Sequence, residues 1–282
     1  MSNVFNIGID VGGTFTDLVA IDEAGRTVFA KSPSTPQDQS IGVMAGLDEL
    51  AGRLGLPRAD MLAATRRIVH GTTVATNALL ERKGARVALL TTQGHRDVLE
   101  MREGLKGNRY DLRTPPPEPL IPRERRFDVR ERLRANGEVL TALDEDALAR
   151  AVADVRASGA RSVAICFLHA YRNPAHEIAL TERLARDLPD VYVSRSSGVL
   201  PQIKEYERVS TTAVNAYVGP ALRLYLTSLD ERLTAAGFGG SLFIVLSHGG
   251  MAPVGEAGGL SGRTVDLRPP RRLSWRRPGG PV

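Results

Sequence analysis

The chain has 282 residues, of which 42% are hydrophobic and 24% charged, and this balance excludes disorder as its overall state. No segment approaches the roughly 18 consecutive apolar residues of a membrane-spanning helix, and the N-terminus lacks the apolar core of a signal peptide, so we expect a cytoplasmic protein without membrane contact. Of the net charge of +5, residues 253–282 supply +4 through six arginines and two acids, so we expect no nucleic-acid partner for the body of the chain.

Three short apolar runs between residues 4 and 32 predict a β-meander. The connections between these runs contain only a few residues, which implies that neighbouring strands are antiparallel. Gly25 can adopt a positive φ in the second connection. Apolar side chains at helical spacing over residues 40–54 then predict a helix, which Gly55 ends.

The next segment predicts a short strand over residues 67–69, the sequence His70-Gly71-Thr72-Thr73, and a helix over residues 74–83. Gly84 occupies the position after this helix where a left-handed residue is expected. Five prolines between residues 104 and 126 exclude regular structure there, so we expect an extended loop that covers a site.

Helices and strands alternate in the rest of the chain, which indicates an α/β layer. The predicted strands cover residues 86–91, 162–168, 191–194 and 242–246, and the predicted helices cover residues 144–158, 174–187 and 207–236. Pro220 lacks an amide proton and is expected to kink the longest helix. Cys166 lies in an apolar run, where we expect a buried thiol and no catalytic role.

One short segment combines the features needed to bind a nucleotide: a strand ending in an acid, a turn on two glycines, and a second strand starting with hydroxyls. Gly12 and Gly13 let backbone amides approach phosphate oxygens, and the hydroxyls of Thr14 and Thr16 can donate to the same oxygens. Asp10 is placed to hold a hydrated Mg²⁺ ion. The segment is neither a P-loop nor a dinucleotide fingerprint. The alternative, an ordinary glycine hairpin, leaves the acid and the hydroxyls unexplained.

A second candidate group follows the strand at residues 67–69. The hydroxyls of Thr72 and Thr73, together with the first amides of the following helix, are candidates to bind an anion, and Asn77 is placed one turn further on. The alternative is that either threonine only caps the helix. For His70, contact with substrate and a structural role both remain open. His95, His169, His176 and His248 have no mutual spacing for zinc.

The glycine hairpin resembles the phosphate-1 motif shared by actin, sugar kinases and heat-shock chaperone ATPases. The wider pattern resembles the hydantoinase A and 5-oxoprolinase family. Besides the hairpin, the segments that carry this second resemblance are residues 70–78, 86–97, 166–169, 173–177 and 205–217. Glu205, Glu207 and Arg208 in the last segment are candidates for a polar site between the two parts of the chain, although we favour a solvated helix start.

The resemblance implies an actin-like, ribonuclease H-like N-terminal lobe and ATP-dependent opening of a cyclic amide such as a hydantoin or 5-oxoproline. In that chemistry ATP phosphorylates the ring amide oxygen and water then attacks the carbon, so phosphoryl transfer comes first. We therefore assign catalytic roles to Asp10, His70 and Thr72, with ATP and Mg²⁺ as cofactors. Other members are subunits of ketone carboxylases, and many work with a B-type hydantoinase subunit.

Two further hypotheses remain open: a small-molecule kinase of the same superfold, and a non-catalytic nucleotide-binding module. The resemblance places the family's N-terminal domain at residues 1–198 and the beginning of its ATPase domain at residues 199–252. Family members are much longer, and their second phosphate motif and adenosine-binding residues belong to the part that is absent here. Residues 253–282 form an irregular Arg/Pro/Gly-rich tail, which we interpret as the product of a shifted reading frame in a truncated chain.

Overall fold

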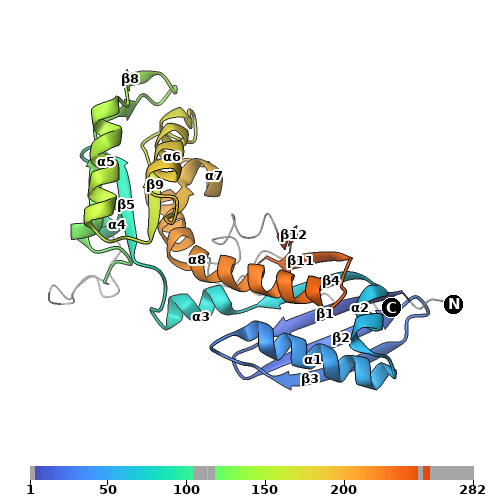
Figure 1. Cartoon of the computed structure of the whole chain (residues 1–282). Helices are drawn as coiled ribbons and strands as arrows, with labels where there is room; N and C mark the ends of the chain where they lie inside the picture. Colours follow the sequence, from blue (N-terminus) through green and yellow to red (C-terminus); the bar gives the residue numbers. More distant parts are fainter. Residues whose placement is uncertain (1–3, 104–112, 114–117, 247–249, 255–282) are drawn as a thin grey trace, which may run out of the picture.

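The computed structural model describes residues 4–103, 113, 118–246 and 250–254. Two sheets lie at opposite ends of the molecule, and one long helix, α8, connects them (Figure 1). The extended loop that we predicted at residues 104–126 lies partly outside the described residues, and residues 255–282 of the predicted tail lie outside them as well. Among the described residues, no helix is both long enough and apolar enough to cross a membrane.

The first sheet has six strands in the order β12-β11-β4-β1-β2-β3. Its strands are β1 (Phe5–Val11), β2 (Phe15–Asp22), β3 (Thr27–Pro33), β4 (Thr65–Thr72), β11 (Ser241–Val245) and β12 (Met251–Pro253). The pairs β1–β2 and β2–β3 are antiparallel, which confirms the predicted meander, whereas β4 is parallel to both β1 and β11. Strands from both ends of the chain therefore build this sheet.

One face of the first sheet is buried under helices. Helix α1 (Gln39–Leu54), α2 (Arg58–Ala63) and the C-terminal half of α8 pack on it around Ile7, Ile9 and Leu18. The opposite face carries exposed side chains such as Phe15 and Phe29, the second of which is 66% exposed. Period-2 alternation therefore assigns each residue of β1 and β2 either to the helix-covered face or to the open face.

Two boundaries near the predicted anion site differ from expectation. Strand β4 extends through Thr72, so the His70-Gly71-Thr72 segment belongs to the strand and does not follow it. Helix α3 (Val74–Leu80) is shorter than predicted, and Arg82, not Gly84, takes the positive φ after it. Gly84 is required for another reason: a Cβ there would lie 2.2 Å from the ring of Tyr217.

The second sheet has four parallel strands in the order β10-β9-β5-β6. These are β5 (Val87–Thr92), β6 (Arg126–Val129), β9 (Ser162–Cys166) and β10 (Tyr192–Arg195). Helices α5 (Glu145–Ala157) and α6 (Ala175–Asp187) pack on one face of the sheet, and α3, α4 (Val98–Met101) and the N-terminal half of α8 pack on the other. The alternation of helices and strands predicted from the sequence is confirmed.

Several short elements were not predicted. Besides α2, α4 and β12, the shortest of them are the 3-10 helix η1 (Arg123–Arg125), strand β6, the hairpin of β7 (Arg132–Leu133) and β8 (Val139–Thr141), and helix α7 (Ser196–Val199). Each of them is four residues long or shorter, so none has enough length to display a hydrophobic period.

Helix α8 (Glu205–Ala235) runs through Pro220 as one continuous helix. Proline has no amide to donate to the carbonyl of Ala216. The hydroxyl of Ser162 on β9 donates to that carbonyl instead, at 2.6 Å, and the amide of Ala85 donates to the neighbouring carbonyl of Tyr217 at 2.9 Å. The proline thus marks the place where the second sheet is bonded to α8.

Candidate functional site

The turn between β1 and β2 is held from inside by residues of the chain itself. The amide of Gly12 donates to the carbonyl of Phe15 at 3.0 Å, and the Ser34 hydroxyl donates to the carbonyl of Gly12 at 2.8 Å. Gly13 and Thr14 at the tip are exposed, and a Cβ on Gly13 would meet no atom within 4 Å. The tip therefore leaves open space for a ligand beside its backbone.

The two threonines of the hairpin lie in different environments. The exposed Thr14 is free to contact a ligand, whereas Thr16 is fully buried on the helix-covered face. The Thr16 hydroxyl lies 3.1 Å from the Ser34 hydroxyl, which in turn holds the turn. The structure therefore gives Thr16 a role in shaping the turn and does not bring its hydroxyl to the open face.

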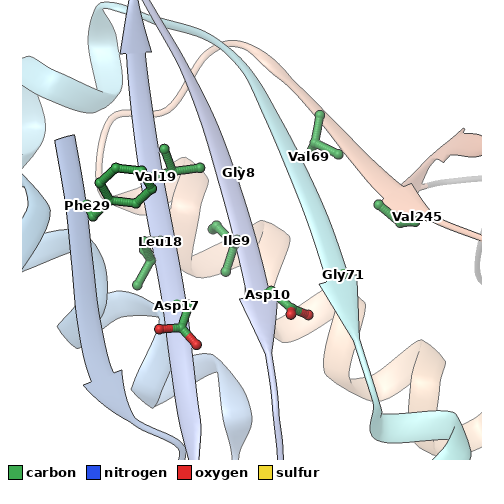
Figure 2. Close-up of a pocket in the computed structure, with 10 residues that line it drawn as sticks. All are labelled: Gly8, Ile9, Asp10, Asp17, Leu18, Val19, Phe29, Val69, Gly71 and Val245. Atoms are coloured by element: carbon green, nitrogen blue, oxygen red, sulfur yellow. The ribbon is translucent and has the colours of Figure 1, made fainter. Parts of the chain in front are cut away.

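Asp10 and Asp17 lie directly opposite each other on β1 and β2, and both project from the open face (Figure 2). Like charges at such a position repel. Lys31 neutralises Asp17 through an ion pair of 3.1 Å, and Asp10 takes part in none of the ion pairs among the described residues. On the other side of Asp10, Gly71 of β4 leaves space, because a Cβ there would lie 3.1 Å from the Asp10 carboxylate.

A hollow of about 460 Å³ lies on the open face beside these carboxylates. Its lining is mostly apolar and is contributed by four neighbouring strands and by the residue that ends β11 (Figure 2). The residues around it are Gly8, Ile9, Asp10, Asp17, Leu18, Val19, Phe29, Val69, Gly71 and Val245. The carboxylates are the only charged groups among them.

His70 points to the opposite side of the sheet from Asp10. Its ring is fully buried under α8, where its Nε2 atom lies 2.7 Å from the Tyr225 hydroxyl. Burial lowers the pKa of His70 from 6.5 to about 4, so the ring is neutral near pH 7. The geometry favours the structural role that the sequence left open, and His70 and Asp10 are not brought together.

The two threonines at the end of β4, Thr72 and Thr73, are engaged mainly with the backbone. The Thr72 hydroxyl accepts from the amide of Val74 at 3.2 Å, and the Thr73 hydroxyl donates to the carbonyl of Val11 at 3.1 Å. The side-chain amide of Asn77 donates to Thr73 at 3.3 Å. This chain of bonds ties the start of α3 to the end of β1 and leaves the proton of Thr72 available for a ligand.

The polar residues at the start of α8 divide into two groups. Glu207 is paired with Lys204 at the surface, as expected for a solvated helix start. Arg208 is only 1% exposed, and its Nη1 atom donates to the carbonyl of Phe167 at 2.8 Å. For Arg208 the expectation of a solvated position is therefore wrong, because the helix start is packed against the end of the second sheet.

Sequence reasoning also missed a buried acid network beside Arg208. Glu131 is bonded to Thr92 and to His176, with 2.7 Å between its Oε2 atom and the histidine Nδ1. Glu177 accepts from the Ser196 hydroxyl at 2.6 Å and from the amide of Phe167 at 2.9 Å. The family-like segments at residues 166–169 and 173–177 contain part of this network, and they were the signal available in the sequence.

Comparison with known proteins identifies the family. The sequence pattern described as the hydantoinase/oxoprolinase N-terminal region matches residues 6–188, and the pattern described as hydantoinase/oxoprolinase matches residues 208–265. The chain is 40% identical over 251 residues to the caprolactamase subunit alpha of Pseudomonas jessenii, and this match covers 88% of the chain and 36% of that subunit.

Two solved structures match over almost the whole chain. The crystal structure of the ATP-dependent caprolactamase from Pseudomonas jessenii matches with a TM-score of 0.81 at 38% identity, over 92% of this chain and 38% of that one. The nucleotide-free structure of acetone carboxylase, from a study of ATP-dependent acetone carboxylation, matches with a TM-score of 0.83 at 28% identity, over 93% and 39%. The chain thus spans little more than a third of the length of these relatives. Its fold is the actin-like ATPase fold of both neighbours, and the chain belongs to the hydantoinase/oxoprolinase family.

Proposed function

We propose that this chain supplies the first phosphate-binding element of an ATP-dependent enzyme that opens a cyclic amide, of the hydantoin or 5-oxoproline type. The observation that carries the proposal is the exposed Asp10 carboxylate at the end of β1, beside a glycine turn whose tip is open. The ATP-dependent caprolactamase supports the choice of an amide substrate, because the chain is 38% identical to it over the matched region.

The hairpin supplies two kinds of group to a nucleotide. The exposed backbone at Gly13 and the hydroxyl of Thr14 are placed to donate to phosphate oxygens, as glycine turns do in other anion sites. The buried Thr16 and Ser34 hold the turn in shape from the helix-covered face. We propose that Thr72, whose hydroxyl proton is available, contacts the same phosphates from β4, and that Thr73 and Asn77 position it.

The carboxylates on the open face fit a magnesium ion. Mg²⁺ binds few protein oxygens and keeps most of its water, so an exposed carboxylate with free space around it is a suitable ligand. Asp10 has that space because β4 carries Gly71 beside it, and Asp17 lies directly across the strand pair. When bound there, Mg²⁺ would neutralise phosphate charge and also relieve the repulsion between the two carboxylates.

Phosphoryl transfer in this site depends on positioning more than on an acid or base from the protein. We therefore propose that His70 acts only through structure, by fixing β4 against α8 through Tyr225. This revises the catalytic role that we assigned to His70 from the sequence. Asp10 and Thr72 keep their proposed roles at the reacting phosphate.

A subunit of a ketone carboxylase is the second candidate function. The specific observation in its favour is the TM-score of 0.83 to acetone carboxylase, which is as high as the score to the caprolactamase. Both readings share the phosphate site and differ in the group that receives the phosphate. The match to a protein named as a subunit also supports a partner chain, which we propose to be a B-type hydantoinase subunit.

The nucleotide part of the proposal is tested by titrating Mg·ATP into the purified chain and into the variants Asp10→Ala and Asp190→Ala. Asp190 is an exposed acid of the second sheet region and serves as the matched control. We expect weak, saturable binding that is reduced about tenfold or more in Asp10→Ala, since a charge-assisted contact contributes about 1.5–3 kcal/mol. Equal affinity in wild type and Asp10→Ala would contradict the proposal.

The substrate part is tested by ADP release in the presence of the B-type subunit. Hydantoin, 5-oxoproline and a lactam are compared with acetone plus bicarbonate and with a panel of sugars. Release that depends on a cyclic amide supports the first function, and release that depends on the ketone supports the second. Release that depends only on a sugar would identify a kinase and refute both.

A further inference from the structure

The carboxyl edge of the second sheet has the geometry at which α/β proteins bind ligands. In the order β10-β9-β5-β6, the chain leaves β5 towards β6 and leaves β9 towards β10, so the two connections diverge between β5 and β9. In open parallel sheets, ligand sites form outside the carboxyl ends of the strands at such a point. The family-like segments at residues 166–169 and 205–217 meet here, and the proposed nucleotide site uses neither.

A small crevice lies at this point, between the ends of β5 and β9 and the start of α8. The buried Thr91 and Arg208 form part of its floor, and the half-buried His95 and Glu205 form part of its rim. Its volume of about 10 Å³ accommodates one water-sized group. A ligand would therefore insert a narrow polar end into the crevice and leave the rest at the rim.

The floor of the crevice contains two hydrogen-bond donors without partners. The Nη1 atom of Arg208 donates to Phe167 and to Ser196, and Nη2 donates to Glu205 at 3.1 Å, but Nε has no partner among the described residues. The hydroxyl of Thr91 is likewise buried without a partner in that part of the chain. Such groups usually cost about 1–3 kcal/mol each, so a ligand that accepts from both would recover that cost.

The two charged side chains that line the crevice, Arg208 and Glu205, balance each other. The Arg208 guanidinium is paired with the Glu205 carboxylate, so an anionic ligand would meet the carboxylate at the rim. Burial, followed by the charge of Arg132, lowers the pKa of His95, so that ring adds no charge at neutral pH. Two donors on the floor and one carboxylate acceptor on the rim match a neutral group that carries both an acceptor and a donor.

We propose that this crevice is a second ligand site, which binds the terminal carboxamide of a small unbranched molecule. The carbonyl oxygen accepts from Nε of Arg208 and from the hydroxyl of Thr91, and the amide N–H donates to Glu205. A planar carboxamide is narrow enough to place its oxygen in a space for one water-sized group.

The crevice is separate from the proposed nucleotide site. Arg208 and Tyr225 are 17 positions apart on α8, which corresponds to about 26 Å along the helix. Tyr225 contacts His70 next to Gly71, so a ligand in the crevice is far from Asp10. The inference therefore does not depend on the proposed phosphoryl transfer, and it can be tested without nucleotide.

The test measures the binding of propionamide to the full chain by ligand-observed NMR, in wild type, Thr91→Val and Thr27→Val. The first variant removes the unpartnered hydroxyl at constant shape, and the second makes the same change at an exposed position of β3. We expect saturable binding to wild type and Thr27→Val and at least fivefold weaker binding to Thr91→Val. Equal affinity in all three proteins, or no binding to wild type, would overturn the proposal.

Two further measurements make the result unambiguous. Thermal unfolding without ligand should show Thr91→Val to be at least as stable as wild type, because a buried hydroxyl without a partner stabilises nothing. Weaker binding together with retained stability then assigns the loss to the missing contact. Propionate serves as the charged analogue, and tighter binding of propionate than of propionamide would overturn the assignment of a neutral ligand.

Discussion

The buried pair of His70 and Tyr225 makes the stability of the protein depend on pH in a predictable direction. The pKa of His70 is about 4 in the folded chain and 6.5 as the ordinary value, so the unfolded chain binds the proton more readily. The stability that comes from the neutral ring is therefore complete above pH 6.5 and is lost as the pH falls from 6.5 towards 4. Between pH 7.5 and pH 5 this group alone should remove about 2 kcal/mol from the free energy of unfolding.

The assay is urea unfolding of wild type and His70→Gln at both pH values. Glutamine carries no titratable group, and its side-chain oxygen can still accept a hydrogen bond from Tyr225. The difference between the two proteins in their change with pH cancels the contribution of all other titrating groups. We expect wild type to lose about 2 kcal/mol more than the variant. The same loss in both proteins would show that the ring is not held neutral, and the structural assignment of His70 would fail.

Three other substitutions, one of them with a control, test the packing around the two sheets, each by urea unfolding. Gly84→Ala should lower the free energy of unfolding by about 1–3 kcal/mol, because its methyl group would lie 2.2 Å from the ring of Tyr217. The control Gly52→Ala, in open space on α1, should raise it by about 1 kcal/mol. An unchanged free energy in Gly84→Ala would show that the contact is loose. Ser162→Ala should lower the free energy of unfolding by about 1–3 kcal/mol, because it removes the hydroxyl that donates to the carbonyl of Ala216. An unchanged midpoint would contradict that bond. Asp144→Ala should lower the free energy of unfolding by about 1 kcal/mol because Asp144 is the N-cap of α5, and an unchanged midpoint would contradict that role.

Helices and strands that are specified by residues close together in the sequence could be predicted. The meander followed from period-2 alternation and short turns, and α1 followed from apolar spacing closed by Gly55, which takes a φ of 69°. The turn of the hairpin was also predictable, because two adjacent glycines, Gly12 and Gly13, separate two strand patterns. The assignment of Gly84 failed because its constraint comes from Tyr217, a residue distant in sequence.

The face on which each candidate side chain lies was harder to predict, and it depended on strand boundaries. We ended the strand at residue 69, which left the direction of His70 undefined. Extending it through Thr72 would have placed His70 on the same face as Ile68 by period-2 alternation, and Ile68 is fully buried. The same rule applied to β2 separates the buried Thr16 from the exposed Asp17. The alternation of buried and exposed side chains was present in the sequence, and only the C-terminal boundary of β4 was predicted wrongly.

The long-range geometry of the molecule is set by contacts that no local pattern reveals, and α8 shows why. Its N-terminal half packs on the second sheet and its C-terminal half on the first, so the two sheets can keep a fixed distance only if α8 is fixed to both. Pro220 removes one of the helix's own bonds between these halves, and helical regularity alone cannot hold that point rigid. The bonds from Ser162 and from the amide of Ala85 act there, on the carbonyls of two adjacent residues in the turn before the proline. The separation of the crevice from the hairpin therefore depends on how the second sheet is bonded to α8 beside Pro220.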